Sequence, residues 1–379
     1  MRTAIVSDLH LGAASGEDVL RDPAVRRVLL EEIAAADRVV LLGDVVELRD
    51  LALGVVLDSA RPFFEELGEA LGEREVAIVP GNHDHRLAEP LLDRLSLAGA
   101  SELGLEQHDD APADGAGAVI DAWLGPANLR IAYPGLWLRE DVYATHGHYM
   151  DAHLSLPRAE CLAVATLIRL SGALPSPAAP GDYERVLRPI YGFSFGVAQA
   201  RARAGRPRSH PSEAAWKALA GEDSGASSRQ RLRAASVRAA FPLGIRAINR
   251  LLHSDFESDI SANAIFSAGV EAATELATRL RVDGAHVITG HTHRGGPNEG
   301  EATWPLAGGG QLHNTGSWVF ASAFHNPGTP PSPYWPGTVT WVEDEAPPRR
   351  VQLLLDRSHP EMIELIGRTR GASSPATRR

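Results

Sequence analysis

The first twelve residues of the chain, MRTAIVSDLHLG (residues 1–12), decide its fold. Ala4 to Ser7 form a short apolar run typical of a buried strand, and polar residues and a glycine follow at once. In an extended segment, Asp8 and His10 project to the same side, as two ligands of one metal ion must. The stretch therefore predicts a buried strand with a candidate metal-binding pair at its carboxyl end.

The same pattern of an apolar run ending in Gly, Asp, Asn or His recurs along the chain. The five runs are Ala4–Ser7, Arg38–Leu42, Val76–Pro80, Val142–Thr145 and Ala285–Thr289. Helix-like stretches at Asp22–Ala36 and Arg61–Gly72 separate the first three, which indicates crossover helices between strands. Further strands are expected at Leu129–Leu138, bent at Pro134-Gly135, and at Gln311–Asn314, Thr338–Val342 and Val351–Leu355. We predict an α/β fold, arranged as a two-sheet sandwich flanked by helices.

The middle of the chain has a different composition, which is rich in alanine, arginine and leucine. Helical patterns are expected at Ala159–Leu170, Gln230–Leu252 and Asn263–Leu280, with loops around Pro175, Pro177 and Pro180 and at Gly221–Ser228. We predict a discontinuous core of residues 1–149 and 283–356, a helical cap insertion at 150–282 and a partly disordered C-terminal tail at 357–379.

Composition limits the class of protein. The chain has 379 residues, of which 44% are hydrophobic and 22% charged, as in a folded protein with two compact units or one large insertion. No apolar run approaches the roughly 20 residues that cross a bilayer, and the N-terminus lacks the features of a signal peptide. A single cysteine, Cys161, fits a reducing compartment, so we expect a cytoplasmic protein. The net charge of −11 argues against a protein that coats nucleic acids.

Five short motifs carry the chemistry, one after each of the five apolar runs. They are Asp8-Leu9-His10, Gly43-Asp44, Gly81-Asn82-His83-Asp84, His146-Gly147-His148 and Gly290-His291-Thr292-His293. Ligands in α/β sheets bind beyond the carboxyl ends of the strands, so these residues can form one cluster although they span most of the chain.

The order of these motifs, D-x-H, G-D, G-N-H-D, H and G-H-x-H, resembles the calcineurin-like metallophosphoesterase superfamily over about residues 1–149 and 283–320. The resemblance implies an αββα sandwich and two metal ions, divalent or trivalent, with manganese favoured over iron or zinc. It assigns Asp8, His10, Asp44 and His293 to one ion and Asn82, His146 and His291 to the second, with Asp44 bridging both. It also implies attack by a metal-bridging hydroxide.

The resemblance makes His83 the candidate general acid that protonates the leaving group, and it places Glu47 where a carboxylate orients this histidine. His148 and Arg294 are candidate substrate contacts because each is adjacent to a predicted ligand, and Arg86 is a further candidate. Two departures separate the chain from particular branches. Leu48 stands where phosphoprotein phosphatases have arginine, with Arg49 one residue later, and His83 stands where the lipid A pathway pyrophosphohydrolases have arginine.

We therefore predict a dinuclear metal-dependent phosphoesterase acting on a phosphomonoester or phosphodiester. A nuclease or a lipid-linked pyrophosphate hydrolase is an alternative within the superfamily, and a non-catalytic metal-binding scaffold is an alternative of another class. Residues 184–250 carry 13 basic residues against 4 acidic ones. A positive cap predicts attraction to an anionic polymer or an anionic membrane surface. No obligate protein partner is expected.

Overall fold

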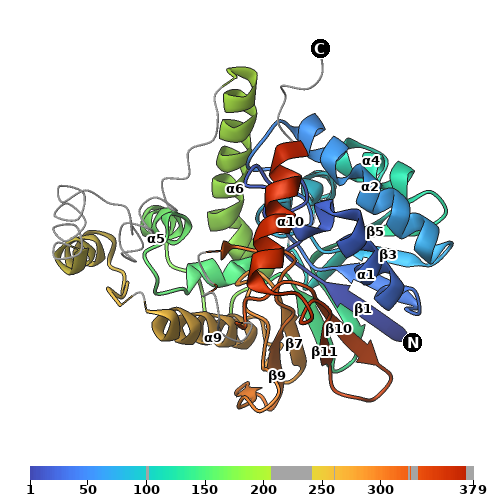
Figure 1. Cartoon of the computed structure of the whole chain (residues 1–379). Helices are drawn as coiled ribbons and strands as arrows, with labels where there is room; N and C mark the ends of the chain where they lie inside the picture. Colours follow the sequence, from blue (N-terminus) through green and yellow to red (C-terminus); the bar gives the residue numbers. More distant parts are fainter. Residues whose placement is uncertain (100–101, 206–240, 260, 323–324, 326–331, 373–379) are drawn as a thin grey trace, which may run out of the picture.

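The computed structural model describes the chain except for residues 100–101, 206–240, 260, 323–324, 326–331 and 373–379 (Figure 1). In this described part, eleven strands form one hydrogen-bonded sheet in the order β11-β10-β1-β2-β3-β5-β6-β7-β9-β8, with β4 paired to β5. The strands are β1 (Arg2–Val6), β2 (Arg38–Leu41), β3 (Glu75–Ile78), β4 (Glu106–Asp110), β5 (Asn128–Arg139), β6 (Val142–Thr145), β7 (His286–Thr289), β8 (Trp304–Pro305), β9 (Gln311–Asn314), β10 (Thr338–Glu343) and β11 (Arg349–Gln352).

The long strand β5 joins the two halves of this sheet. Its first residues run parallel to β3, which continues the parallel set β1, β2 and β3. Its last residues, from Gly135 to Arg139, pair antiparallel with β6, which begins a second parallel set with β7 and β9. Residues of both halves, among them Ile5, Val40, Leu136 and Ile288, share one buried cluster between them. The sheet is thus curled around its own core.

The predicted mixed α/β class is confirmed. The separation into two sheets stays a prediction, because hydrogen bonding is continuous from β11 to β8. The expected strands are found within three residues of their predicted ends, and the last is displaced most, ending at Gln352 rather than Leu355. Strands β1, β2 and β6 are almost entirely buried, as their continuous apolar runs require.

Most helices of the N-terminal half pack on the outer face of the first half of the sheet (Figure 1). They are α1 (Pro23–Ile33), α2 (Leu53–Leu71) and α4 (Gly115–Leu124), with 3-10 turns η1 (Val19–Arg21) and η2 (His85–Leu87). Helix α3 (Glu89–Leu97) differs, because its Leu91 and Leu92 pack with the helices between β6 and β7. Helix α1 begins where expected because the Asp22 side chain accepts from the backbone N–H of Ala24 at 2.8 Å. Helix α2 begins eight residues before the predicted Arg61, since Val56, Leu57 and Ala60 are also buried on its inner face.

Helices between β6 and β7 cover the outer face of the second half of the sheet. They are η3 (His148–Ala152), α5 (Ala159–Ser171), α6 (Pro180–Arg203), a helical segment at 241–252 and α9 (Ala262–Arg279). They share one buried cluster with Tyr133, Tyr143 and Val287 of the sheet. The helices expected at Ala159–Leu170 and Asn263–Leu280 are present. The Gln230–Leu252 helix is described only from residue 241, and the Gly221–Ser228 loop lies outside the described residues.

The expectation of a loop around Pro180 is wrong, because a helix of 24 residues, α6, begins at this residue. Proline suits the first turn of a helix, where its missing N–H costs no hydrogen bond. The Asp182 side chain accepts from the backbone N–H of Ala179 at 2.9 Å and so satisfies another free donor at this end. The separation of residues 150–282 as a cap domain remains a prediction. Among the described helices, none combines the length and hydropathy needed to cross a membrane.

Within the predicted C-terminal tail at 357–379, residues 359–372 form helix α10 (His359–Ala372), and partial disorder of the tail stays a prediction. The Ser358 backbone N–H donates to the Glu361 carboxylate at 2.7 Å, which is one of the two hydrogen bonds of a capping box at the start of this helix. Met362, Leu365 and Ile366 are buried in the main core cluster. Residues 373–379 of the predicted tail lie outside the described part.

If α10 is part of the core, Leu365→Ala should lower the free energy of unfolding by about 2–4 kcal/mol, because it removes buried methyl groups and leaves a cavity. The neighbouring Ile363, which is 46% exposed, supplies the control, and Ile363→Ala should cost less than about 1 kcal/mol. Urea unfolding curves of both variants make the comparison. Equal, small losses would show that α10 contributes nothing to core stability.

Candidate metal centre

The loops after β1 and β2 continue to pair beyond the ends of their strands. The backbone N–H of Asp8 donates to Gly43 O at 3.0 Å, and that of His10 donates to Asp44 O at 2.8 Å. The ligand residues of these loops and of the loop after β7 adopt a left-handed backbone that residues other than glycine seldom take, and such strain gathers at functional sites. The φ angles are 53° for Asp8, 45° for His10, 52° for Asp44, 66° for His291 and 61° for His293.

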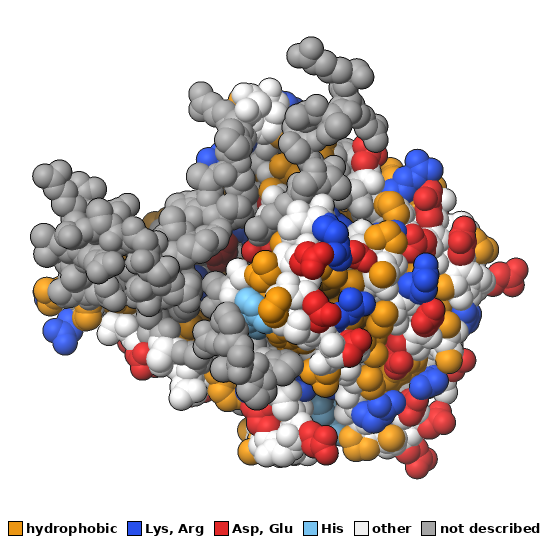
Figure 2. Space-filling model, viewed as in Figure 1, with side chains coloured by type: hydrophobic (Ala, Val, Ile, Leu, Met, Phe, Trp, Pro, Cys, Tyr) orange, Lys and Arg blue, Asp and Glu red, His pale blue; other side chains and the backbone are white. Residues whose placement is uncertain are grey.

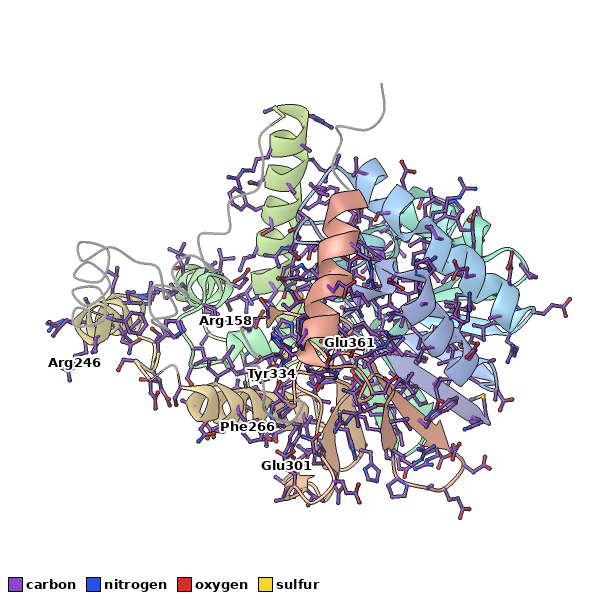
Figure 3. The ribbon with its side chains drawn as sticks, viewed as in Figure 1. Arg158, Arg246, Phe266, Glu301, Tyr334 and Glu361 are labelled. Carbon is purple, nitrogen blue, oxygen red and sulfur yellow. The ribbon has the colours of Figure 1, made fainter. Side chains whose placement is uncertain are left out.

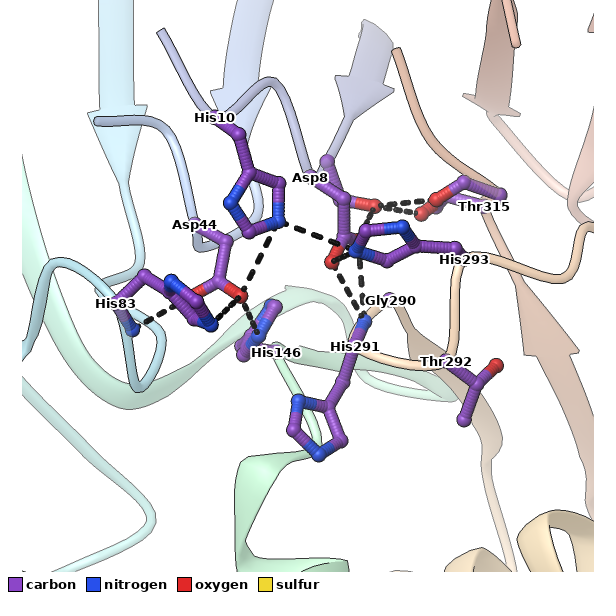
Figure 4. A network of polar contacts seen from close by, with 12 residues as sticks. Asp8, His10, Asp44, His83, His146, Gly290, His291, Thr292, His293 and Thr315 are labelled. Atoms are coloured by element: carbon purple, nitrogen blue, oxygen red, sulfur yellow. Dashed lines mark hydrogen bonds and ion pairs between the residues drawn. The ribbon is translucent and has the colours of Figure 1, made fainter. Parts of the chain in front are cut away.

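Donor atoms from five loops meet at this place (Figure 4). In the described part of the chain, three overlapping groups have their ligand atoms within 4.8 Å of one another: Asp8, His10 and His293; His10, Asp44 and His83; and Asp44, His146 and His291. Asp44 belongs to two of the groups, and His10 links these to the third. Asp44 Oδ2 lies 3.6 Å from His10 Nε2 and 3.3 Å from His146 Nε2. The structure therefore brings the predicted ligands of both ions to a single centre with Asp44 in the middle.

Asn82 reaches the same centre with its side-chain amide. The amide oxygen lies 3.2 Å from His291 Nδ1 and 3.3 Å from Asp44 Oδ2, so acceptor atoms face one another, and turning the amide by 180° would let its nitrogen donate to both. The turn would also let the amide oxygen accept from the Arg49 guanidinium at 3.1 Å, whereas in the unturned orientation a cation beside the amide oxygen would satisfy the three facing acceptors. Together with the buried carboxylates and imidazoles, this donor set fits a divalent metal ion of borderline character.

Two of the predicted ligand histidines use their other ring nitrogen for a hydrogen bond within the protein. His146 Nδ1 lies 2.9 Å from Leu42 O, which can only accept, so Nδ1 carries the proton and Nε2 is left for the centre. His291 Nε2 lies 2.9 Å from Asp151 Oδ1, which leaves its Nδ1 facing Asn82 and Asp44. Sequence reasoning missed Asp151. The only signal was a carboxylate five residues after His146, in the turn η3.

Asp84 ties two of the loops together. Its buried carboxylate accepts from the backbone N–H groups of Gly81 at 2.6 Å, Val45 at 2.7 Å and Asp44 at 3.2 Å. Burial and the nearby charge of Asp44 raise the pKa of this carboxyl to about 6. The aspartate of the Gly-Asn-His-Asp motif thus holds the bridging residue by its backbone.

The turn at residues 314–318 supports the loop after β7. The Asn314 amide donates to Gly290 O at 2.7 Å, and the Trp318 indole donates to Thr338 O at 3.0 Å. These contacts give the turn a structural role.

Glu47 contacts two histidines at once. Its Oε2 lies 2.5 Å from His83 Nδ1 and 3.0 Å from His10 Nδ1. His83 Nε2 then points toward Asp44 Oδ2, 4.0 Å away, and 22% of the His83 side chain is exposed to solvent. A fixed imidazole with one nitrogen on a carboxylate and the other at the edge of the centre has the geometry that a general acid needs.

The two predicted substrate contacts, His148 and Arg294, have partners within the protein. His148 is buried, with Nε2 3.1 Å from the Tyr133 hydroxyl, and burial together with the charges of His146 and His85 holds its pKa well below the usual value. Arg294 donates to Glu301 at 2.6 Å and stacks over Phe266, 3.8 Å from its ring centroid. Both side chains are thus engaged within the protein, and their contact with substrate stays a prediction.

The family comparison agrees with the class of protein that the motifs predict. Residues 1–166 match the family model of the calcineurin-like phosphoesterases, which confirms the resemblance over the first four motifs. The same family match confirms the predicted enzyme class, a metal-dependent phosphoester hydrolase. Among solved structures, a dimetal phosphatase from Danio rerio is similar with 12% identity and a TM-score of 0.28, over 93% of this chain and 99% of that one. No curated protein matches the chain.

Gly81 leaves room for the centre, because a Cβ there would collide with the Asp44 carboxylate and the His146 ring. Gly81→Ala should therefore weaken metal binding by at least about tenfold, as displacement of supporting groups does in other metal sites. Gly54→Ala is the matched control, since its Cβ would meet nothing within 4 Å. Calorimetric titration with Mn²⁺ measures both. Unchanged affinity in Gly81→Ala would contradict this packing.

Metal binding should release protons. Burial lowers the pKa of the His10 and His146 rings, but hydrogen bonds and charges from Glu47 and Asp44 outweigh it and raise their pKa to about 9 and about 10 in the metal-free site. A metal ion displaces these protons, so affinity should rise with pH until about pH 10. Titration with Mn²⁺ at pH 7 in two buffers of different ionisation enthalpy counts the protons released. We expect about one to two for the filled site, and none would contradict the assignment.

Proposed function

We propose that the protein hydrolyses phosphate esters at a dinuclear metal centre. One ion is held by Asp8, His10, Asp44 and His293, and the second by Asn82, His146, His291 and the shared Asp44. The observation that carries the proposal is the position of Asp44 Oδ2 between His10 and His146, with His83 at the open edge. Two such ions would polarise the phosphoryl oxygens and supply an activated water molecule as the nucleophile. Manganese is our favoured metal.

The residues of the chain divide the remaining work. Water oxygen bonds to phosphorus as the ester P–O bond breaks, and the electron pair leaves with the ester oxygen. His83 gives this oxygen its proton, and Glu47 holds the imidazole in place through Nδ1 and stabilises its charged form. Asp151 and Leu42 orient the ligand histidines so that a ring nitrogen of each faces the centre.

The substrate is a phosphomonoester or a phosphodiester. A panel of monoesters, diesters, pyrophosphates, single-stranded DNA and a phospholipid, each with added Mn²⁺, tests the proposal and separates it from a nuclease or a lipid-linked pyrophosphate hydrolase. Turnover that is lost with chelator and restored by Mn²⁺ supports it. Metal binding without turnover on any member would favour a non-catalytic scaffold instead.

The basic segment at 184–250 remains our proposed contact for an anionic polymer or membrane surface. Arg188 is already paired with Glu89 and Asp93, whereas Arg246 lies on the outer part of the helical region (Figure 3). Residues 206–240, which contain most of the basic side chains of this segment, lie outside the described part. On the face of the core seen in Figure 2, acidic and basic side chains are interspersed, so the contact is assigned to the helical segment.

If His83 is the general acid, His83→Asn should slow hydrolysis of an alkyl phosphate ester by about 10²–10³-fold, because the poor leaving group needs a proton. A 4-nitrophenyl ester, whose leaving group needs little protonation, should change by less than about tenfold. Steady-state rates on both substrates, with metal content by mass spectrometry, make the measurement.

His108→Asn supplies the control, because this side chain is 48% exposed on β4. It should leave both rates unchanged. An equal loss on both esters in His83→Asn would indicate a positioning role, and loss of a metal ion would make His83 a ligand.

A further inference from the structure

A cavity of about 110 Å³ opens beside the candidate acid, between the loop after β3 and helix α6. Its lining begins at the predicted metal ligand Asn82 and at His83 and continues away from the centre along α6. The other lining residues are Arg49, His85, Arg86, Glu89, Tyr191, Gly192 and Phe195. Because a general acid faces the ester oxygen that leaves, a cavity next to His83 is the space that the leaving group would occupy.

Most charged groups around this cavity are paired within the protein. Arg49 is paired with Glu160 at 2.9 Å, Glu89 with Arg188 at 3.1 Å, and His85 with Glu184 at 3.1 Å. Arg86 is exposed and lies over the Phe195 ring, 5.7 Å from its centroid. Within the described part of the chain it has no acidic partner, so its guanidinium group is available to a ligand at the lining of the cavity.

Tyr191 adds a polar group without a partner. Its side chain is buried, 3% exposed, with its ring 5.1 Å from that of His85 and 5.5 Å from that of His148. Its hydroxyl makes no hydrogen bond to any described residue. A buried hydroxyl without a partner costs free energy, and a ligand that enters the cavity can supply the missing partner. Gly192, next on the helix, leaves this wall open, since a Cβ there would meet nothing within 4 Å.

We propose that the natural substrate is a phosphate ester whose leaving group itself carries an anionic group, a carboxylate or a second phosphate. Arg86 binds this anion, and the Tyr191 hydroxyl hydrogen-bonds to the leaving group deeper in the cavity. The inference rests on the proposed hydrolytic function and deepens it by assigning the substrate class. Arg86 and Tyr191 are then the residues that select the substrate, while the metal ligands and His83 perform the reaction.

Two aryl esters test the proposal: 3-carboxyphenyl phosphate and its neutral carboxamide analogue, as monoesters or methyl diesters according to which type the Mn²⁺-loaded protein hydrolyses. The preference is the ratio of kcat/KM for carboxylate over carboxamide. Arg86→Gln should lower this ratio about tenfold, as expected for the loss of one charge-assisted hydrogen bond. Comparing ratios between proteins removes the intrinsic difference in reactivity of the two esters.

Arg61→Gln is the matched control, since Arg61 is an exposed arginine of α2 that pairs with Glu65 and lies outside the cavity lining. It should keep the wild-type ratio. Tyr191→Phe should lower kcat/KM for both esters about threefold without loss of metal, as for the loss of one neutral hydrogen bond. A 3-phosphonophenyl ester separates the two sources of the anion, because a stronger preference for it than for the carboxylate indicates a phosphate-bearing leaving group.

The outcomes are distinct. The same ratio in Arg86→Gln and wild type, with both esters turned over, overturns the substrate class and leaves the hydrolytic function standing. Unchanged kinetics in Tyr191→Phe would show that the Tyr191 hydroxyl does not bind the leaving group. No hydrolysis of any of these esters by the metal-loaded wild type overturns the proposed function, and this inference with it.

Discussion

The buried carboxylate of Asp44 is the group on which the rest of the site depends. One oxygen accepts the His83 backbone N–H at 2.9 Å, and the other faces His10 and His146. Its own backbone, in a left-handed conformation, is held by Asp84. An isolated charge this deeply buried would be strongly unfavourable. Histidines on several sides, or the cations they bind, supply the compensation, so the loops that carry them converge on this one residue.

The curl of the sheet makes that convergence possible. Because β5 pairs with β3 along its first part and with β6 along its last, the loops after β6 and β7 come to face those after β1 and β2. Two hydrogen bonds join these loops. Gly290 N–H donates to His146 O at 3.0 Å, and His291 N–H donates to the Asp8 carboxylate at 3.0 Å. A flat sheet with the same strand order would leave the two ligand sets apart.

Helix α6 is fixed to the core by a buried polar cluster. Glu184 accepts from the hydroxyls of Tyr133 at 2.5 Å and Tyr149 at 2.6 Å, and its other oxygen lies 3.1 Å from His85 Nε2. Burial opposes the charge of this carboxylate, but the charge of His85 and these hydrogen bonds lower its pKa. A buried, fully partnered network of this kind orients what it joins. Glu184 lies about two helical turns before Tyr191 and Gly192, so the network sets the cavity wall formed by these two residues at a defined distance from the centre.

The sequence by itself predicted the strands and the residues at their ends, because an apolar run followed by Gly, Asp, Asn or His is a local signal. It also carried two signals that went unused: Pro180 at a helix start and the Ser358–Glu361 capping box. Those features depend on neighbours only a few residues away. The sequence could also list candidate ligands, since the order of the motifs along the chain is enough for that.

Only the tertiary structure decided which side chains complete the site. Asp151 meets His291, 140 positions later, and Arg86 comes to lie over Phe195 on α6; neither pair has a spacing that sequence reasoning could exploit. Conversely, Arg294 directly follows the predicted ligand His293, but its guanidinium group donates a hydrogen bond to Glu301. Adjacency along the chain fixes how far a side chain lies from the centre, but its direction depends on the partners that packing brings to it.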